Sequence, residues 1–213
     1  LAQVRPPVTK PKATSGDSVA EPEWEKRLSI SVGPRKADLV GTNEKVLQAA
    51  VDYMAAMGGG TVRVLPGEYR LRNAVHMRSN VRLLGSGAES VLKKEASATV
   101  KLADDSDWYD QEITLASGKG FQVGDGVCLR AKNPHNGSST VIKRTLVARS
   151  GNRFKLNAGL RKNLWLTGNP TCSTLFPILN CEHVKHVAIE NITLDGNRKN
   201  NANLDGNYAG CIF

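Results

Sequence analysis

Apolar positions recur at helical spacing in one stretch of the chain, over about residues 43–57. The stripe comprises Val46, Leu47, Ala50, Val51 and Met54. Residues three and four apart share one face of a helix, so this stripe predicts an amphipathic helix with a single buried face. Thr42 or Asn43 can cap its first turn, and three successive glycines at 58–60 end it, because glycine readily leaves helical backbone geometry.

After this helix the pattern changes to short strands separated by turns. Residues 61–65 are rich in β-branched side chains, which is typical of a strand, and the Pro-Gly pair that follows indicates a turn. Further short strands are expected at residues 69–71, 75–77, 81–84, 90–92, 175–179, 187–189, 192–194 and 211–213. The 20-residue step from Thr61 to Val81 is close to one coil of a solenoid built from short parallel strands.

Residues 104–170 interrupt this rhythm with longer expected strands. The pairs Asn136-Gly137 and Gly151-Asn152 between them are typical of hairpin turns, so we expect an antiparallel β insertion here. The chain then divides into a disordered linker at 1–27, a cap with the first coils at 28–103, the insertion at 104–170, and further coils at 171–213.

Both ends of the sequence indicate a piece of a longer protein. The chain begins with Leu1 and a tract rich in Pro, Lys, Thr and Ser that runs to about Pro22, which is a linker composition. It stops on the apolar, strand-like residues 211–213. We therefore expect the N-terminal part of a longer protein, truncated at its C-terminus.

Charge changes this picture in one segment. The 213 residues include 29 Lys and Arg against 20 Asp and Glu, for a net charge of +9. No acidic residue occurs between Asp125 and Glu182, whereas nine basic residues do: Arg130, Lys132, Lys143, Arg144, Arg149, Arg153, Lys155, Arg161 and Lys162. The rest of the chain is balanced, so the whole net charge belongs to this segment. It would attract an acidic polysaccharide or a nucleic acid, or serve only as a solvated basic surface.

Two stretches of sequence resemble the N-terminal entry of the pectate lyase superfamily. They are ADLVGTN at 37–43 and GGGTVRVLPGEYRL at 58–71. In that family a capping helix is followed by a glycine-rich turn, a strand, a Pro-Gly turn and a Tyr. Residues 81–87 are similar to the next strand and its Gly-x-Gly turn, and residues 189–197 to a later coil. The resemblance implies a mainly β fold: a right-handed parallel β-helix with an N-terminal capping helix and an antiparallel β insertion. The helix would cover the open end of the stacked core.

The resemblance also implies a function. Most members act on polysaccharides as lyases, hydrolases or epimerases, and others are viral or phage tail proteins that bind glycans. We expect the N-terminal portion of an exported enzyme, secreted, periplasmic or at the cell surface, that acts as a polysaccharide lyase or hydrolase on acidic glycans. The sequence lacks the family's Asn-Thr-Asp, Gly-His-Gly and Arg-x-Pro-x-x-Arg motifs, so the catalytic residues are expected beyond this chain and the piece alone is expected to be inactive. The alternative is a non-catalytic β-helix used for glycan binding or as a structural spike.

Candidate binding residues fall into three groups. The basic ones, expected to bind an acidic polysaccharide, are Lys143, Arg144, Arg149, Arg153 and Lys155. The repeat Leu-Asp-Gly-Asn at 194–197 and 204–207 supplies Asp195, Asn197, Asp205 and Asn207. Their oxygens could bind sugar hydroxyls, and Asp195 with Asp205 could bind Ca²⁺, although two plain turns are the alternative. Trp108, among several Asp residues, could stack on a sugar ring or belong to a polar hinge.

Other classes of function receive little support from the sequence. Gly85 and Gly87 lack the third glycine and the following helix of a dinucleotide site, and no fold motif accompanies the basic segment, so no nucleic acid partner is expected. No apolar run is long enough to span a membrane. Cys172 and Cys181 could form a disulfide in an exported protein, and packing as small buried side chains is the alternative.

Overall fold

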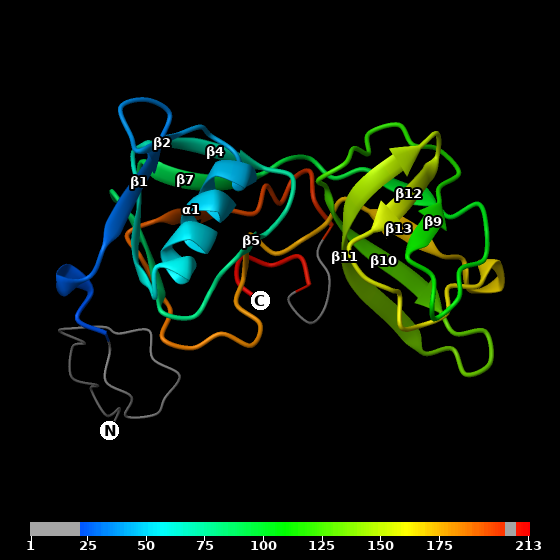
Figure 1. Ribbon diagram of the computed structural model, residues 1–213. Helices are drawn as coiled ribbons and strands as arrows, with labels where there is room; N and C mark the ends of the chain where they lie inside the picture. The colour runs from blue at the N-terminus through cyan, green and yellow to red at the C-terminus, as the bar shows by residue number, and fades with distance from the viewer. Residues whose placement is uncertain (1–21, 203–207) are drawn as a thin grey trace, which may run out of the picture.

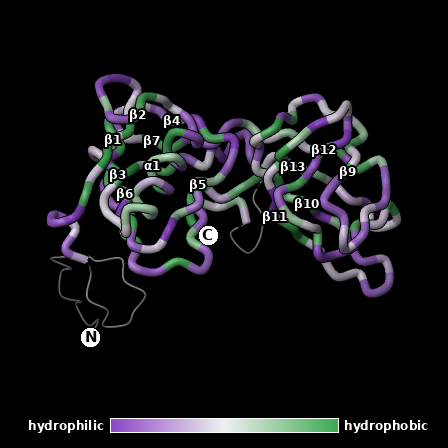
Figure 2. Tube along the Cα trace, viewed as in Figure 1, coloured by the Kyte–Doolittle hydropathy of each residue, from purple (hydrophilic) through white to green (hydrophobic). Residues whose placement is uncertain are grey.

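The computed structural model describes residues 22–202 and 208–213. The fold is mainly β, and the described residues form two β units that lie side by side (Figure 1). One unit consists of parallel sheets covered by an α-helix, and the other is a single antiparallel sheet. Figure 2 shows apolar residues along the strands of both units, whereas many of the connecting loops are hydrophilic.

The elements follow one another along the chain in this order: η1 (Trp24–Lys26), β1 (Ser29–Gly33), β2 (Leu39–Val40), α1 (Glu44–Ala56), β3 (Gly60–Val64), β4 (Gly67–Leu71), β5 (Val75–His76), β6 (Val81–Gly85), β7 (Ser90–Lys94), β8 (Thr99–Lys101), β9 (Glu112–Thr114), β10 (Gly126–Lys132), β11 (Ser139–Ser150), β12 (Arg153–Leu156), η2 (Leu166–Gly168), β13 (Thr171–Ser173), β14 (Leu179–Asn180), β15 (Ala188–Glu190) and β16 (Thr193–Asp195).

Successive passes of the chain build the parallel unit, which we call the stack. Its sheets have the strand orders β15-β6-β3-β1-β2, β16-β7-β4 and β14-β5. Val62 pairs with Leu83, and Leu83 pairs in turn with Ile189 from a pass about a hundred residues later. Gly60 pairs with Val81, so equivalent positions lie 21 residues apart, one more than the sequence predicts. The apolar side chains of each pass therefore pack on those of the next and form one core.

The predicted helix is confirmed as α1, which covers this core. The Asn43 side chain caps it by accepting hydrogen bonds from the backbone N–H groups of Lys45 and Val46. The stripe packs against β1, β3 and β5, with Leu47, Ala50, Val51 and Met54 fully buried and Val46 partly buried. Gly60 follows the helix with a φ of 153°, and a Cβ there would lie 2.3 Å from the Leu28 carbonyl oxygen.

The antiparallel unit is a six-stranded sheet with the order β8-β13-β10-β11-β12-β9. Its two edges meet at a bridge between Leu102 and Leu115, where Ala103 N–H donates to the Thr114 carbonyl at 2.8 Å. The sheet thus closes on itself around a separate apolar core, and we call it the closed sheet. It includes β8 and β13, which lie just outside the range expected for the insertion.

The expected linker at 1–27 differs from the structure at its end. Residues 1–21 lie outside the described residues. Trp24–Lys26, however, forms a 3-10 turn, and Trp24 is only 8% exposed. Glu25 of this turn forms an ion pair with Arg82 of β6 at 2.9 Å, so the end of the expected linker contacts the stack.

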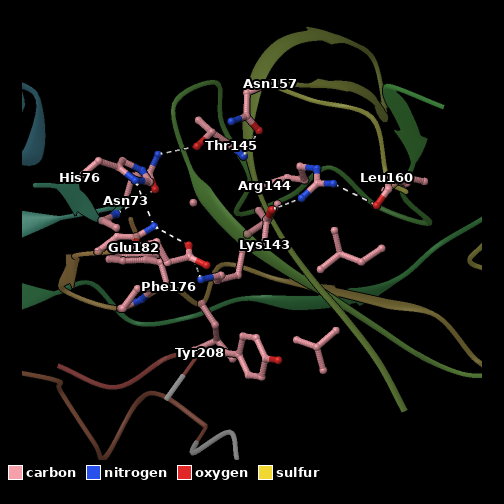
Figure 3. A pocket seen from close by; sticks show the side chains of 18 of the residues that line it. Asn73, His76, Lys143, Arg144, Thr145, Asn157, Leu160, Phe176, Glu182 and Tyr208 are labelled. Atoms are coloured by element: carbon pink, nitrogen blue, oxygen red, sulfur yellow. Dashed lines mark hydrogen bonds and ion pairs between the residues drawn. The ribbon is translucent and has the colours of Figure 1, made fainter. Parts of the chain in front are cut away.

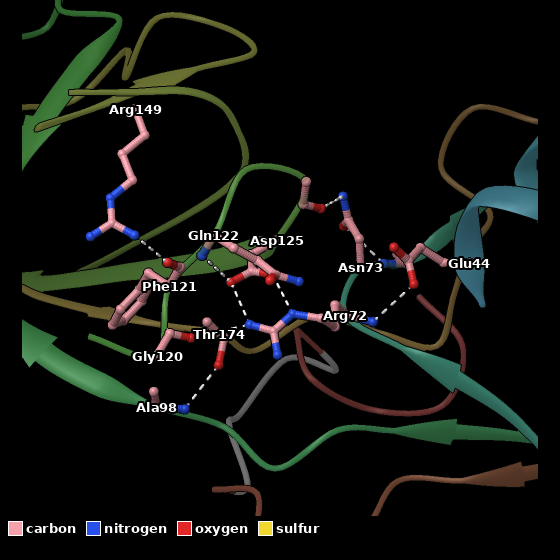
Figure 4. A network of polar contacts seen from close by, with 12 residues as sticks. Glu44, Arg72, Asn73, Ala98, Gly120, Phe121, Gln122, Asp125, Arg149 and Thr174 are labelled. Carbon is pink, nitrogen blue, oxygen red and sulfur yellow. Dashed lines mark hydrogen bonds and ion pairs between the residues drawn. The ribbon is translucent and has the colours of Figure 1, made fainter. Parts of the chain in front are cut away.

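A buried ion pair joins the two units. Asp125 is fully buried, and its carboxylate accepts hydrogen bonds from Arg72 Nε at 2.7 Å and Arg72 Nη2 at 2.9 Å (Figure 4). The backbone N–H of Gln122 donates to the same carboxylate, and that of Arg72 donates to Glu44 at the start of α1. The hydrogen bond from Arg72 to Asp125 raises the pKa of the Arg72 guanidinium. The stack, the helix and the closed sheet therefore meet at Arg72.

Asn73 extends this junction. Its amide group donates to the Gly124 carbonyl and to the Thr145 hydroxyl of β11, at 3.2 and 2.9 Å. Gly126 lies so close that a Cβ there would be 2.3 Å from Asn73 Oδ1. The absence of a side chain at this position allows the close approach of the two units.

A buried lysine holds the end of the described chain to the stack. Lys94 is 1% exposed, and its Nζ donates to the carbonyl oxygens of Phe176 at 2.9 Å and Ala209 at 2.6 Å. Burial lowers the pKa of Lys94 to about 8. Lys94 thus holds two segments, around Phe176 and Ala209, through their backbone carbonyls.

Replacement of Asp125 by Ala should lower the free energy of unfolding by about 3 kcal/mol, because it leaves the Arg72 guanidinium partly buried without its carboxylate. The control is Glu23→Gln, which removes an exposed ion pair with Lys26 and should change stability by less than about 1 kcal/mol. Urea unfolding followed by circular dichroism measures both. Equal losses in the two variants would contradict a special role for Asp125.

The buried Lys94 predicts a specific pH dependence. Its pKa is about 8 when folded and returns to the ordinary 10.5 on unfolding, so between these values the unfolded chain binds more protons. The free energy of unfolding of the native protein, relative to that of Lys94→Met, should therefore rise by up to about 3 kcal/mol from pH 8 to pH 10.5. Urea unfolding across this range tests it, with exposed Lys119→Met as control. If the difference in the free energy of unfolding between the native protein and Lys94→Met does not change with pH, the lowered pKa of Lys94 is contradicted.

Candidate functional site

A cavity of about 450 Å³ opens between the stack and the closed sheet, and we call it the cleft. One wall comes from β5 and β14 of the stack and the other from β11 (Figure 3). Its lining includes four basic side chains, one carboxylate, several amides and two aromatic rings. They are Lys143, Arg144, Arg161, Lys162, Glu182, Asn73, Asn157, Asn180, Phe176 and Tyr208.

The carboxylate of the cleft is already paired. Glu182 Oε2 lies 3.0 Å from Lys143 Nζ and accepts a hydrogen bond from the Asn180 amide at 3.3 Å. Burial alone would raise the pKa of Glu182, but Lys143 and Asn180 outweigh it and hold this pKa below its usual value. Lys143 Nζ also lies 3.1 Å from the centre of the Phe213 ring. Glu182 is therefore ionised near neutral pH and balances Lys143.

His76 lies on the stack side of this group. It pairs with Asn180 in the parallel register of β5 and β14, and its Nδ1 is 3.3 Å from Asn180 Nδ2. Gln48 of α1 fixes the His76 backbone through hydrogen bonds to both its N–H and its carbonyl. Burial, and then the positive charges of Arg78 and Lys143, lower the pKa of His76. The imidazole is therefore neutral near neutral pH and adds a polar but uncharged group to the cleft.

The other end of the cleft is strongly basic. The Arg144 guanidinium donates to the carbonyls of Ala158, Gly159 and Leu160. Burial and the neighbouring charge of Arg161 lower the pKa of Arg144. Within the described residues, neither Arg161 nor Lys162 forms an ion pair. Like charges therefore meet at this end with no carboxylate between them.

The structure does not bring the five predicted basic residues together. Lys143 and Arg144 line the cleft, as described above. Arg149 instead donates to the carbonyls of Gly151 and Phe121, and its guanidinium lies 5.0 Å from the centre of the Phe154 ring. Its hydrogen bonds connect loops of the closed sheet, so its charge is engaged within the protein.

Arg153 and Lys155 lie on β12, away from the cleft. Arg153 forms an ion pair with Glu112, which stands opposite Lys155 in the register of β9 and β12. Both basic residues line a second cavity of about 470 Å³, together with the carboxylates of Asp104, Asp105, Asp110 and Glu112. Trp108 is 46% exposed near this region, and its backbone N–H donates to Asp107 and Asn163. Four carboxylates outnumber two basic side chains here, so this cavity does not favour an acidic ligand.

The predicted Asp/Asn repeat is only partly described. Asp195 accepts a hydrogen bond from the Asn197 N–H at 2.8 Å and pairs with Lys93 at 3.0 Å, and these contacts lower its pKa. The Asn197 amide donates to the Lys94 carbonyl. Asp205 and Asn207 lie outside the described residues. Over 22–202 and 208–213, no cluster of three or more His, Cys, Asp or Glu side chains is placed to hold a metal ion. Ca²⁺ binding stays a prediction.

Cysteine packing follows the second of the two expectations. Cys172 is buried in the core of the closed sheet, and Cys181 packs partly buried against the core of the stack. Both are free thiols, and burial raises the pKa of each. They belong to different cores, so they are not positioned as a pair.

Sequence reasoning missed much of the cleft. Arg161 and Lys162 were visible as part of the basic segment, but nothing local set them apart from its other members. His76 and Asn180 stand side by side only because β5 pairs with β14, across about a hundred residues of sequence. The one sequence signal for this pair was the two short apolar stretches, expected to be strands, in or next to which His76 and Asn180 lie.

Comparisons with known proteins reveal distant likenesses only. No protein family model matches the chain, and no curated protein does. Among solved structures it is similar to the Pseudomonas phage phi297 tailspike gp61 (15% identity, 70% of this chain and 26% of that one, TM-score 0.36). It is also similar to the Gp54 tailspike of Acinetobacter baumannii bacteriophage AP22, solved in complex with A. baumannii capsular saccharide (14% identity, 72% of this chain and 30% of that one, TM-score 0.35). A third similar structure is the tailspike gp49 from Pseudomonas phage LKA1 (15% identity, 70% of this chain and 31% of that one, TM-score 0.32).

The chain spans less than a third of the length of each of these tailspikes. At such identities and TM-scores, the likeness says nothing about activity or ligand. In the part of the chain that the structure describes, no helix has the length and apolar character needed to cross a membrane.

Proposed function

We propose that this chain binds an acidic polysaccharide in the cleft between the stack and the closed sheet. The observation that carries the proposal is the basic end of the cleft, which Arg144 and Arg161 line together and where Arg144 donates to the carbonyl of Leu160, the residue before Arg161. Lys162 adds a third positive charge. A carboxylate from a ligand would relieve the repulsion and form charge-assisted hydrogen bonds with Arg161 and Lys162.

The rest of the lining suits a sugar rather than a small inorganic anion. Asn157 offers an amide group that can exchange hydrogen bonds with hydroxyls, and the ring of Tyr208 offers a flat apolar surface. A volume of about 450 Å³ is in the range of small-molecule sites. Hydroxyls, an apolar ring face and a carboxylate occur together in uronic acid residues, so a polysaccharide containing them matches the whole lining.

The geometry supports binding better than turnover. Glycoside hydrolysis usually needs two carboxylates, one to protonate the leaving group and one to act as nucleophile or base. Glu182 is the one carboxylate among the described residues of the cleft, and it is ionised and paired with Lys143. We therefore propose a glycan-binding or spike role for the chain, in preference to the lyase or hydrolase expected from the sequence.

A finer assignment of the fold accompanies this proposal. We infer that the stack is the beginning of a right-handed parallel β-helix, with α1 as its cap. Three parallel sheets fed by successive passes of the chain support this inference, as does the burial of one helix face against their core.

The double variant Arg161→Gln/Lys162→Gln should weaken binding to polygalacturonate by on the order of tenfold or more, because hydrogen bonds to charged groups contribute about 1.5–3 kcal/mol each. Arg153→Gln/Lys155→Gln removes the same charge from β12, outside the lining of the cleft, and should leave binding unchanged. Affinity electrophoresis and titration calorimetry measure the effect, and native binding should weaken as salt is raised.

Equal weakening by the two double variants would show that total charge, and not the cleft, governs retention. Undiminished binding by Arg161→Gln/Lys162→Gln would remove the cleft as the site. An increase of reducing ends or of unsaturated products on incubation with polygalacturonate would contradict binding without turnover.

A further inference from the structure

A second basic surface lies on the outer face of the closed sheet. Side chains alternate along β10, where Val127 and Leu129 enter the core, so Arg130 and Lys132 point outward. In the antiparallel register of β10 and β11, Arg130 stands opposite Val141 and Lys132 opposite Ser139. The outer face of these two strands is thus polar and basic.

The same face continues across β13 and β8. Thr171 of β13 stands opposite Arg130, and Lys101 of β8 stands opposite Thr171. The four strands β8, β10, β11 and β13 carry six basic residues and no acidic one. This distribution differs from that around Arg153 and Lys155, where nearby carboxylates outnumber the basic side chains.

A cavity of about 470 Å³ lies over this face. Arg130 and Lys132 line it together with the hydroxyl groups of Ser139 and Thr171 and the amide of Asn169. The cavity is separate from the cleft, but Val141 of β11 lines both. Lys143 of the cleft is two residues from Val141, which is about 7 Å along a strand. One extended ligand can therefore reach both cavities.

Arg130 has an unmet hydrogen-bonding requirement. Its Nε is buried and has no hydrogen-bond partner in the part of the chain that the structure describes. Among the described residues, neither Arg130 nor Lys132 forms an ion pair. A buried donor without an acceptor is unfavourable, and two oxygens of one anionic group can accept from the Nε and Nη atoms of a guanidinium at once.

We propose that the cavity around Arg130 is a second subsite, which binds a carboxylate or sulfate group of the same polysaccharide chain that occupies the cleft. The inference rests on the proposed function, because it takes the cleft as the first subsite. A chain long enough to occupy both cavities binds more tightly than a short one, since its second contact is intramolecular.

The experiment is titration calorimetry of the full chain with galacturonate disaccharides, longer galacturonate oligosaccharides and heparin oligosaccharides. Arg130→Gln should weaken binding of the long ligands by on the order of tenfold and leave disaccharide binding unchanged. Arg130→Lys keeps the positive charge but lacks the planar guanidinium group that binds two oxygens at once, so it should weaken binding less than Arg130→Gln does. Arg35→Gln removes an exposed charge from the stack and serves as the matched control, with circular dichroism to verify folding.

Each outcome decides between the two proposals. If Arg161→Gln/Lys162→Gln weakens the binding of all ligands and Arg130→Gln weakens the binding of the long ligands only, both subsites are supported. If affinity does not depend on ligand length or on Arg130, the second subsite is wrong and the cleft remains. If Arg130→Gln abolishes binding and the cleft variant has no effect, the cleft proposal is wrong. Binding of neither polymer to the native chain overturns both. A response to Arg130→Gln with heparin alone identifies the bound group as sulfate.

Discussion

The buried ion pair between Arg72 and Asp125 determines how the two units of this protein sit together. Arg72 lies just before β5, and Asp125 lies just before β10, so the pair connects the start of one wall of the cleft to the sheet that forms the other. Asn73 adds a hydrogen bond to Thr145 on β11, two residues from Lys143. Both walls of the cleft begin at this junction. Because breaking the ion pair is strongly unfavourable, it fixes the position of one wall relative to the other.

The basic segment divides into charges that the protein uses itself and charges that it leaves open. Arg144 and Arg149 bind backbone carbonyls, and Lys143 and Arg153 pair with carboxylates. Those without an ion pair among the described residues are Arg130, Lys132, Lys155, Arg161 and Lys162. Four of these five line the cleft or the cavity around Arg130. Composition alone does not reveal which basic residues are engaged and which are open, because the difference depends on tertiary contacts.

Glu182 shows how the same contacts restrict chemistry. It is the first acidic residue after the basic segment and reaches the cleft from the stack. Pairing with Lys143 lowers its pKa, whereas a general acid in a glycosidase needs a raised one. The neutral His76 beside Asn180 completes a polar wall suited to holding a ligand. The pairing pattern of the cleft therefore supports the proposed binding role better than a hydrolytic one.

The sequence by itself determined the local structure: the stripe of α1, the Asn43 cap, the glycines after the helix and most short strands follow from spacing and backbone preference over a few residues. Only the tertiary structure decided which residues share a site. His76 meets Asn180 through the pairing of β5 with β14. Arg161 comes near Arg144 because the segment after β12 lies against β11, where Arg144 donates to the carbonyls of Gly159 and Leu160. Such contacts join residues distant in sequence, and their geometry depends on how whole strands stack and close, which no local pattern encodes.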